Sequence, residues 1–109
     1  MPHIAMTALA VTLAAATPAT KAETLAGLYG ETLGAAASCP NLPRERLDGV
    51  TQLAAAHLKA EADKPKTEDA VSRQLAAGIE RGRRAIATGR ETCPQALSEF
   101  DDLEHDLKR

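Results

Sequence analysis

Apolar residues recur every three or four positions along most of the chain, which is the spacing of one face of an α-helix. In the stretch 22–38 these positions are Leu25, Leu28, Tyr29, Leu33 and Ala36. Gly27, Gly30 and Gly34 lie in the same stretch, where each weakens an isolated helix. The pattern predicts a helix that either packs closely on a neighbour or bends locally, and that ends before Pro40.

Two more stretches have the same period. Pro43 suits a first helical turn, and it opens a predicted helix over 43–62 with inward positions Leu47, Val50, Leu53, Ala54 and Leu58. Thr67 is the expected cap of the next helix, and Gly89 its stop. The apolar stripe of that helix is Val71, Leu75, Ile79, Gly82 and Ile86. Gly78 and Gly82, four residues apart, would let a neighbouring backbone come close.

A shorter helix is predicted after Thr92 or Cys93, with Pro94 in its first turn. Its buried face is expected to be Ala96, Phe100, Leu103 and Leu107. With short connections throughout, the sequence predicts an all-α protein: a small antiparallel bundle of three longer helices plus a short C-terminal helix.

The chain has two cysteines, Cys39 and Cys93, and each precedes a proline at a helix junction. In an up-down-up arrangement the first and third helices end at the same pole, so a Cys39–Cys93 disulfide is expected. A bridge between residues 54 apart restricts the unfolded chain by about 4 kcal/mol in the loop-entropy model. Free thiols that serve as metal ligands or as a redox pair are less compatible with this wide spacing.

The first twenty residues contain no Asp, Glu, Lys or Arg, and the run from Ile4 to Ala16 is almost entirely apolar. This is typical of a secretory signal, predicted over 1–22 with cleavage after Ala22, or alternatively after Ala16 or Ala19. The alternative is an ordinary Ala-rich first helix. The run is too short to cross a bilayer of about 30 Å, so no permanent membrane anchor is expected. The mature domain would be 23–109, periplasmic or secreted.

Composition argues against two classes of function. Thirteen basic and fifteen acidic residues leave the chain slightly acidic, and Tyr29 and Phe100 are its only aromatic side chains, which disfavours nucleic-acid binding. The sequence contains no nucleophile motif, no Gly-rich phosphate loop and no metalloprotease motif, so no enzymatic activity is expected.

The C-terminal helix departs from an ordinary mixture of charges. Between Ser98 and Asp106 the chain has acids and no Lys or Arg; they are Glu99, Asp101, Asp102, Glu104 and Asp106. At 100° per residue, Glu99, Asp102 and Asp106 fall within an arc of about 60° on one helix face. These carboxylates repel each other and also oppose the helix dipole, and a hard cation would remove both penalties.

The predicted metal site therefore consists of Glu99, Asp102, Asp106, Glu91, Asp101 and His105, and the expected ion is calcium or a lanthanide. Such a set leaves coordination positions for water, a small anion or a second copy, so a homodimer is a possible state. His105 leaves zinc as an alternative, and a merely solvated acidic face is another. The predicted function is a non-enzymatic exported binding protein for a metal ion. The alternative is a periplasmic chaperone-like or structural protein that binds a protein partner without a metal.

Overall fold

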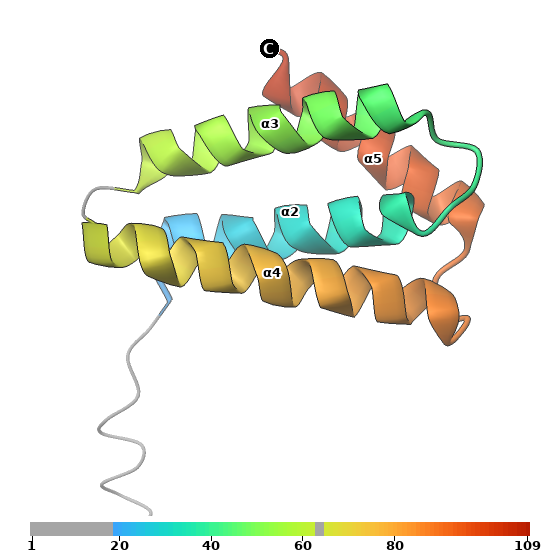
Figure 1. Ribbon diagram of the computed structural model, residues 1–109, viewed down its shortest axis with the longest axis horizontal. Helices are drawn as coiled ribbons and strands as arrows, with labels where there is room; N and C mark the ends of the chain where they lie inside the picture. The colour runs from blue at the N-terminus through green and yellow to red at the C-terminus, as the bar shows by residue number, and fades with distance from the viewer. Residues whose placement is uncertain (1–18, 63–64) are drawn as a thin grey trace, which may run out of the picture.

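The computed structural model describes residues 19–62 and 65–109, and within them every regular element is helical. The helices are α2 (Lys21–Ala37), α3 (Arg44–Glu61), α4 (Pro65–Ala87) and α5 (Cys93–Leu107), as Figure 1 shows. The all-α prediction is confirmed. Most of the predicted leader lies outside the described residues.

Local chemistry accounts for where the helices begin and end. Thr20 caps α2 by accepting a hydrogen bond from the Glu23 N–H, and a reciprocal capping box joins Thr92 to Gln95 at the start of α5. Gly89, at φ 75°, takes the left-handed conformation that follows α4. The predicted cap at Thr67 is wrong, because α4 begins two residues earlier at Pro65, a residue whose fixed φ suits the first turn.

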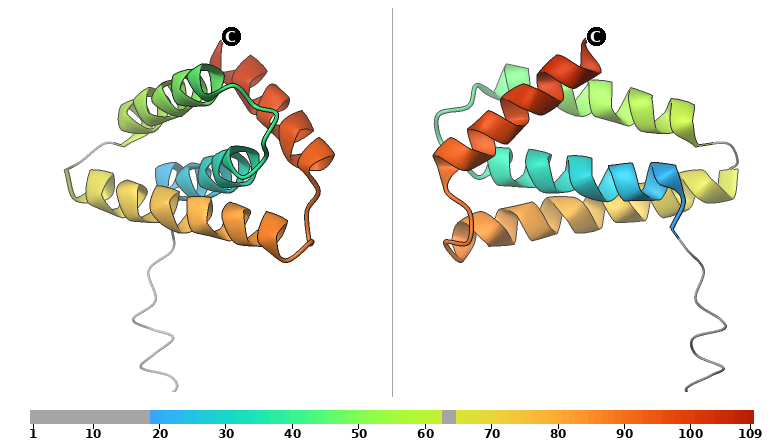
Figure 2. Two further views of the ribbon diagram at one scale, coloured as in Figure 1. Left: turned by 45° about the vertical axis from the view of Figure 1, so that its right-hand side comes forward. Right: turned by 180° about the vertical axis from the view of Figure 1, so that it is seen from behind.

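Consecutive helices alternate in direction, as predicted for an antiparallel bundle. Helices α2 and α4 run parallel and lie side by side, α3 runs back along α2, and α5 crosses obliquely from the end of α4 towards α3 (Figures 1 and 2). The predicted antiparallel order therefore holds for consecutive helices. The two helices in closest contact, α2 and α4, run in the same direction, as expected for the first and third helices.

Glycines bring α2 and α4 into direct backbone contact. A Cβ placed on Gly30 would lie 2.8 Å from the Ile79 nitrogen, and one on Gly82 would lie 2.7 Å from the Ala35 nitrogen. The contact is reciprocal, since a Cβ on Gly78 would lie 3.1 Å from the Gly30 Cα. These distances are too short for a side chain, so the predicted close packing of the glycine-rich stretches is confirmed. We call this contact the glycine interlock.

Side chains around the interlock form a core with three parts. One lies between α2, α3 and α5 and contains Leu33, Ala36, Val50, Ala54, Phe100 and Leu103. The second, at the start of α2, contains Ala22, Ala26, Leu58 and Val71. The third surrounds the disulfide with Ala35, Cys39 and Ala96.

Three residues expected inside are largely exposed: Leu28 at 56%, Leu53 at 36% and Ile79 at 38%. On the face of α2 that meets α4 the buried positions are glycines and alanines, because the interlock leaves no room there for leucine.

The predicted disulfide is confirmed. Cys39 and Cys93 are bridged with their Cα atoms 5.7 Å apart, at the end of the molecule where α2 and α4 both terminate. The bridge therefore fixes the start of α5 against the end of α2. Among the described helices, none has both the length and the apolar character required to cross a membrane.

The interlock predicts opposite effects for two glycine-to-alanine substitutions. Gly34→Ala would place a Cβ 2.7 Å from the Ile79 carbonyl carbon, so α2 and α4 must separate. We expect the free energy of unfolding, measured by urea titration, to fall by about 1–3 kcal/mol.

Gly49→Ala is the matched control, because Gly49 lies within α3 with no atom near its Cβ position. This variant should be stabilised by up to about 1 kcal/mol, since alanine is the better helix former. Equal effects of the two substitutions would contradict the interlock.

Candidate functional site

Helix α5 carries most of the predicted site, and its position follows from one apolar face. The capping box and Pro94 start the helix, and Ala96, Phe100 and Leu103 bury its inner face against α2 and α3. The acidic residues must therefore lie on the remaining surface of the helix. They fall into two groups, one facing α3 and one facing solvent.

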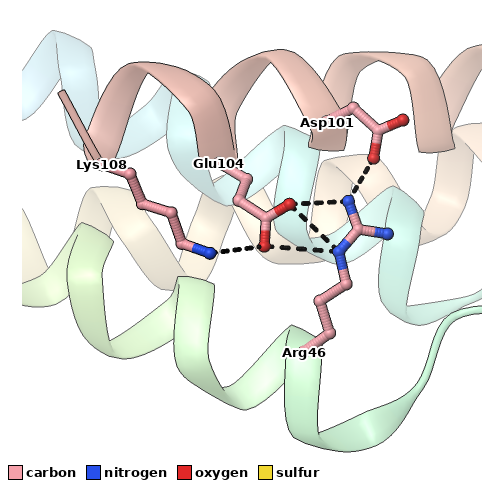
Figure 3. A network of polar contacts seen from close by, with 4 residues as sticks. All are labelled: Arg46, Asp101, Glu104 and Lys108. Atoms are coloured by element: carbon pink, nitrogen blue, oxygen red, sulfur yellow. Dashed lines mark hydrogen bonds and ion pairs between the residues drawn. The ribbon is translucent and has the colours of Figure 1, made fainter.

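The group that faces α3 is neutralised by Arg46. The Arg46 guanidinium donates hydrogen bonds to both Asp101 and Glu104 (Figure 3). The distance from Arg46 Nη2 to Glu104 Oε1 is 2.7 Å. Lys108 Nζ adds a bond of 3.2 Å to Glu104 Oε2. The Arg46 guanidinium also lies over the Phe100 ring, 5.2 Å from its centroid. This network joins α3 to α5 and removes two acids from the set available to a cation.

Arg46 also favours the charged form of Glu104. The hydrogen bond from Arg46 is the main reason that the pKa of Glu104 is lowered, and Lys108 contributes to the same shift. The pKa of Arg46 is raised in turn, first by its hydrogen bond to Glu104. Glu104 is therefore held in its charged form beside Arg46 at neutral pH.

The second group is the acidic face, which we define as Glu99, Asp102 and Asp106. All three are exposed, and the helical spacing places them on one face of α5 beside the buried stripe. His105 is exposed beside them. Asp106 accepts a hydrogen bond of 3.0 Å from Arg109 Nη2, although both side chains are largely in solvent.

Glu91 belongs to a different environment, a polar pocket where α2, α4 and α5 meet. Its volume is about 440 Å³, and its lining consists of Glu31, Arg81, Gly82, Ala85, Arg90, Glu91, Gln95 and Glu99. On one side of the pocket Arg81 Nε donates to Glu31 Oε1 over 2.8 Å. Glu99 therefore lies at the boundary between this pocket and the acidic face.

The surroundings of the Glu91 carboxyl disfavour its charged form. Its Oε1 is buried and receives no hydrogen bond from any residue that the structure describes. Burial is the main cause of the raised pKa of Glu91, followed by the neighbouring Glu99 carboxyl, with which it can share a proton, and by the charge of Glu31. Glu91 and Glu99 thus form a carboxyl pair.

The six predicted metal ligands are therefore divided among three surroundings. Asp101 is bound to Arg46, Glu91 pairs with Glu99 at the pocket, and Asp102, His105 and Asp106 are exposed on α5. Within 19–62 and 65–109, no three His, Cys, Asp or Glu side chains converge closely enough to hold a metal ion. The metal site stays a prediction.

Sequence reasoning missed Arg46 as the partner of the acidic helix. It lies 55 residues before Asp101, and no local spacing links the two. Its only signal in the sequence is its place in the first turn of the α3 segment, at the end of the molecule to which the disulfide also brings α5.

A second, mostly apolar depression lies between α3 and α4. Its volume is about 230 Å³, and its lining is Ala55, Leu58, Lys59, Ala62, Glu68, Val71, Ser72 and Leu75. We call it the apolar groove. It is distant in sequence from α5 and contains none of the predicted ligands.

Comparison with protein-family models, with curated proteins and with solved structures gives no match for this chain.

The Arg46 network predicts a stability change that depends on pH. Because the folded pKa of Glu104 is lowered, its ion pair stabilises the fold above its ordinary value of 4.5 and is lost as the pH falls through the folded pKa. Arg46→Gln should lower the free energy of unfolding by about 1 kcal/mol at pH 7, and by less below the folded pKa.

Arg44→Gln is the control for Arg46→Gln, since Arg44 is an exposed arginine in the same turn of α3. It should leave stability almost unchanged at either pH. If the loss of unfolding free energy in Arg46→Gln stayed the same at a pH below the folded pKa of Glu104, charge pairing would not be its cause.

The pair of Glu91 and Glu99 predicts a stability that changes with pH in the opposite direction to that of the Arg46 network. A raised folded pKa means that the protonated carboxyl stabilises the fold below the ordinary value, and that this contribution is lost as the pH rises through the folded pKa. Glu91→Gln provides a neutral donor to Glu99, so urea titration at pH 7 should show a gain of about 1 kcal/mol. The gain should shrink towards pH 4, and the exposed Glu45→Gln should show none.

Proposed function

We propose that this protein is an exported, non-enzymatic binding protein whose ligand is a hard cation, calcium or a lanthanide. The carboxylates of the acidic face bind the ion, and two copies of the chain share it. The observation that carries the proposal is the division of acids on α5: Arg46 holds Asp101 and Glu104, whereas Glu99, Asp102 and Asp106 stay exposed.

The charge of the acidic face supports a cation as the ligand. Glu99, Asp102 and Asp106 are neighbours at three- and four-residue spacing, where like charges destabilise a helix. Asp106 also lies in the last turn of α5, where a carboxylate opposes the helix dipole. An ion bound by oxygen ligands relieves both penalties, and calcium and the lanthanides prefer such ligands.

The number of ligands supports a site shared between two copies. Calcium takes six to eight oxygen ligands, as hard cations of this size generally do. The acidic face of one copy presents three carboxylates, and among the described residues no three His, Cys, Asp or Glu side chains, these included, lie close enough to hold an ion by themselves. Two acidic faces related by a twofold axis would present six carboxylates to one or two ions, and each copy would neutralise the other's repulsion through the metal.

Two further features support export. The disulfide between Cys39 and Cys93 is typical of an oxidising compartment such as the periplasm. The apolar run from Ile4 to Ala16, which lies outside the described residues, has the character of a secretory signal.

A protein-binding role without a metal is the second candidate. The apolar groove supports it, because its lining combines Leu58, Val71 and Leu75 with small side chains that leave room for an apolar group. In that case, metal would change neither the size of the protein in solution nor its stability.

A titration followed by size-exclusion chromatography with light scattering tests the first proposal. Calcium or lanthanum added to the metal-free protein should release or absorb heat in isothermal titration, and should shift the mass in solution from one copy to two. The variant Glu99→Gln/Asp102→Asn/Asp106→Asn should lose at least tenfold in affinity and should remain a monomer with metal.

The matched control removes the same number of carboxylates elsewhere. Glu45→Gln/Asp48→Asn/Asp69→Asn neutralises three exposed acids on α3 and α4 and should bind and dimerise as the parent does. Equal loss in both variants would reduce the effect to net charge, and the absence of heat in the parent would refute the cation proposal.

A further inference from the structure

The start of α2 bears on where the exported chain is processed. The small residues Thr20 and Ala22 favour signal cleavage after Ala22, whereas Ala16 and Ala19 are possible earlier cleavage positions. The structure describes the two residues joined by each of the last two candidate bonds, Ala19–Thr20 and Ala22–Glu23, and these two bonds lie in very different surroundings.

Thr20 has a structural role that a signal sequence does not need. Its backbone is extended, with φ −73° and ψ 166°, and its hydroxyl accepts the Glu23 N–H over 3.2 Å. The Thr20 carbonyl also accepts the first backbone hydrogen bond of α2, from the Thr24 nitrogen over 3.0 Å. Thr20 is thus the N-cap that satisfies two of the first N–H groups of the helix.

Ala22 belongs to the core. Its exposed fraction is 2%, and it packs with Ala26, Leu58 and Val71, which come from three helices. Beside it, Lys21 Nζ lies 3.9 Å from Glu61 Oε1 at the end of α3. The two residues before Glu23 therefore contact the end of α3 and the start of α4, the part of the fold farthest from the disulfide.

Cleavage after Ala22 would remove all of these contacts together. The helix would lose its cap and its first turn, and Leu58 and Val71 would lose the alanine that covers them. The new amino group on Glu23 would place a positive charge at the helix N-terminus, where the dipole disfavours it. Cleavage before Thr20 removes none of these contacts.

We infer that the leader is removed on the amino side of Thr20, so that Thr20, Lys21 and Ala22 belong to the mature domain. This inference depends on the proposed export and replaces the predicted boundary after Ala22. The small residues at Ala19 and Ala16 supply the cleavage position, in sequence outside the folded helix.

The test is expression of the full chain with its own leader in a bacterium that has a periplasm, followed by intact mass of the reduced periplasmic protein. A mature chain that begins at Thr20, or at Thr17, supports the inference. A chain that begins at Glu23 overturns it and leaves export intact. A chain that keeps its first residue and stays in the cytoplasm overturns export as well, so the two failures are distinguishable.

A matched pair of variants gives a second readout that does not depend on the mass. In protein purified from the periplasm, Thr20→Val should lower the thermal midpoint because the cap acceptor is lost. Thr24→Val, whose hydroxyl only bonds back to the Thr20 carbonyl, is the control and should shift the midpoint less. Identical midpoints for Thr20→Val and the parent would mean that the mature chain lacks the cap, and would overturn the inference.

Discussion

The close backbone contact between α2 and α4 is the constraint on which the rest of this structure depends. Where Gly30 faces Gly78, no Cβ fits, so the two helices lie nearer than helices with ordinary side chains can. Dispersion between backbone atoms replaces the usual interdigitation of side chains. A chain with few aromatic residues can thus form a dense core with alanine and glycine, and its larger apolar residues are used on the other side of α2.

The parallel direction of this pair has consequences at both ends of the molecule. At one end α2 and α4 terminate together, so Cys39 meets Cys93 and the first residues of α5 are fixed. From there α5 crosses obliquely towards α3, and the ion pair between Arg46 and Glu104 fixes α5 against α3. At the other end, the core depends on Ala22 at the start of α2. The acidic face is therefore presented on a helix whose two ends are both anchored.

The sequence predicts the parts of this fold that depend on local rules. Helical periodicity, Pro94 in the first turn of α5 and the disulfide are recovered, because capping and spacing act over a few residues and the cysteines have only one partner. The exposure of Leu28 could not be predicted from the helical spacing of apolar residues alone. Whether a glycine-rich helix face packs closely or bends is decided by its partner, and close packing displaced leucine from the buried stripe.

The acidic helix illustrates the same limit for function. Its spacing correctly predicts that Glu99, Asp102 and Asp106 share a face, but local charge counting overstates the repulsion, since Arg46 arrives from α3 to neutralise Asp101 and Glu104. The cation proposal is thereby reduced to Glu99, Asp102 and Asp106, of which only Asp106 forms an ion pair within the described residues, with Arg109. Because three oxygen-bearing side chains do not complete the sphere of a hard cation, the proposed site requires that cation binding and self-association occur together, with each copy supplying the ligands that the other lacks.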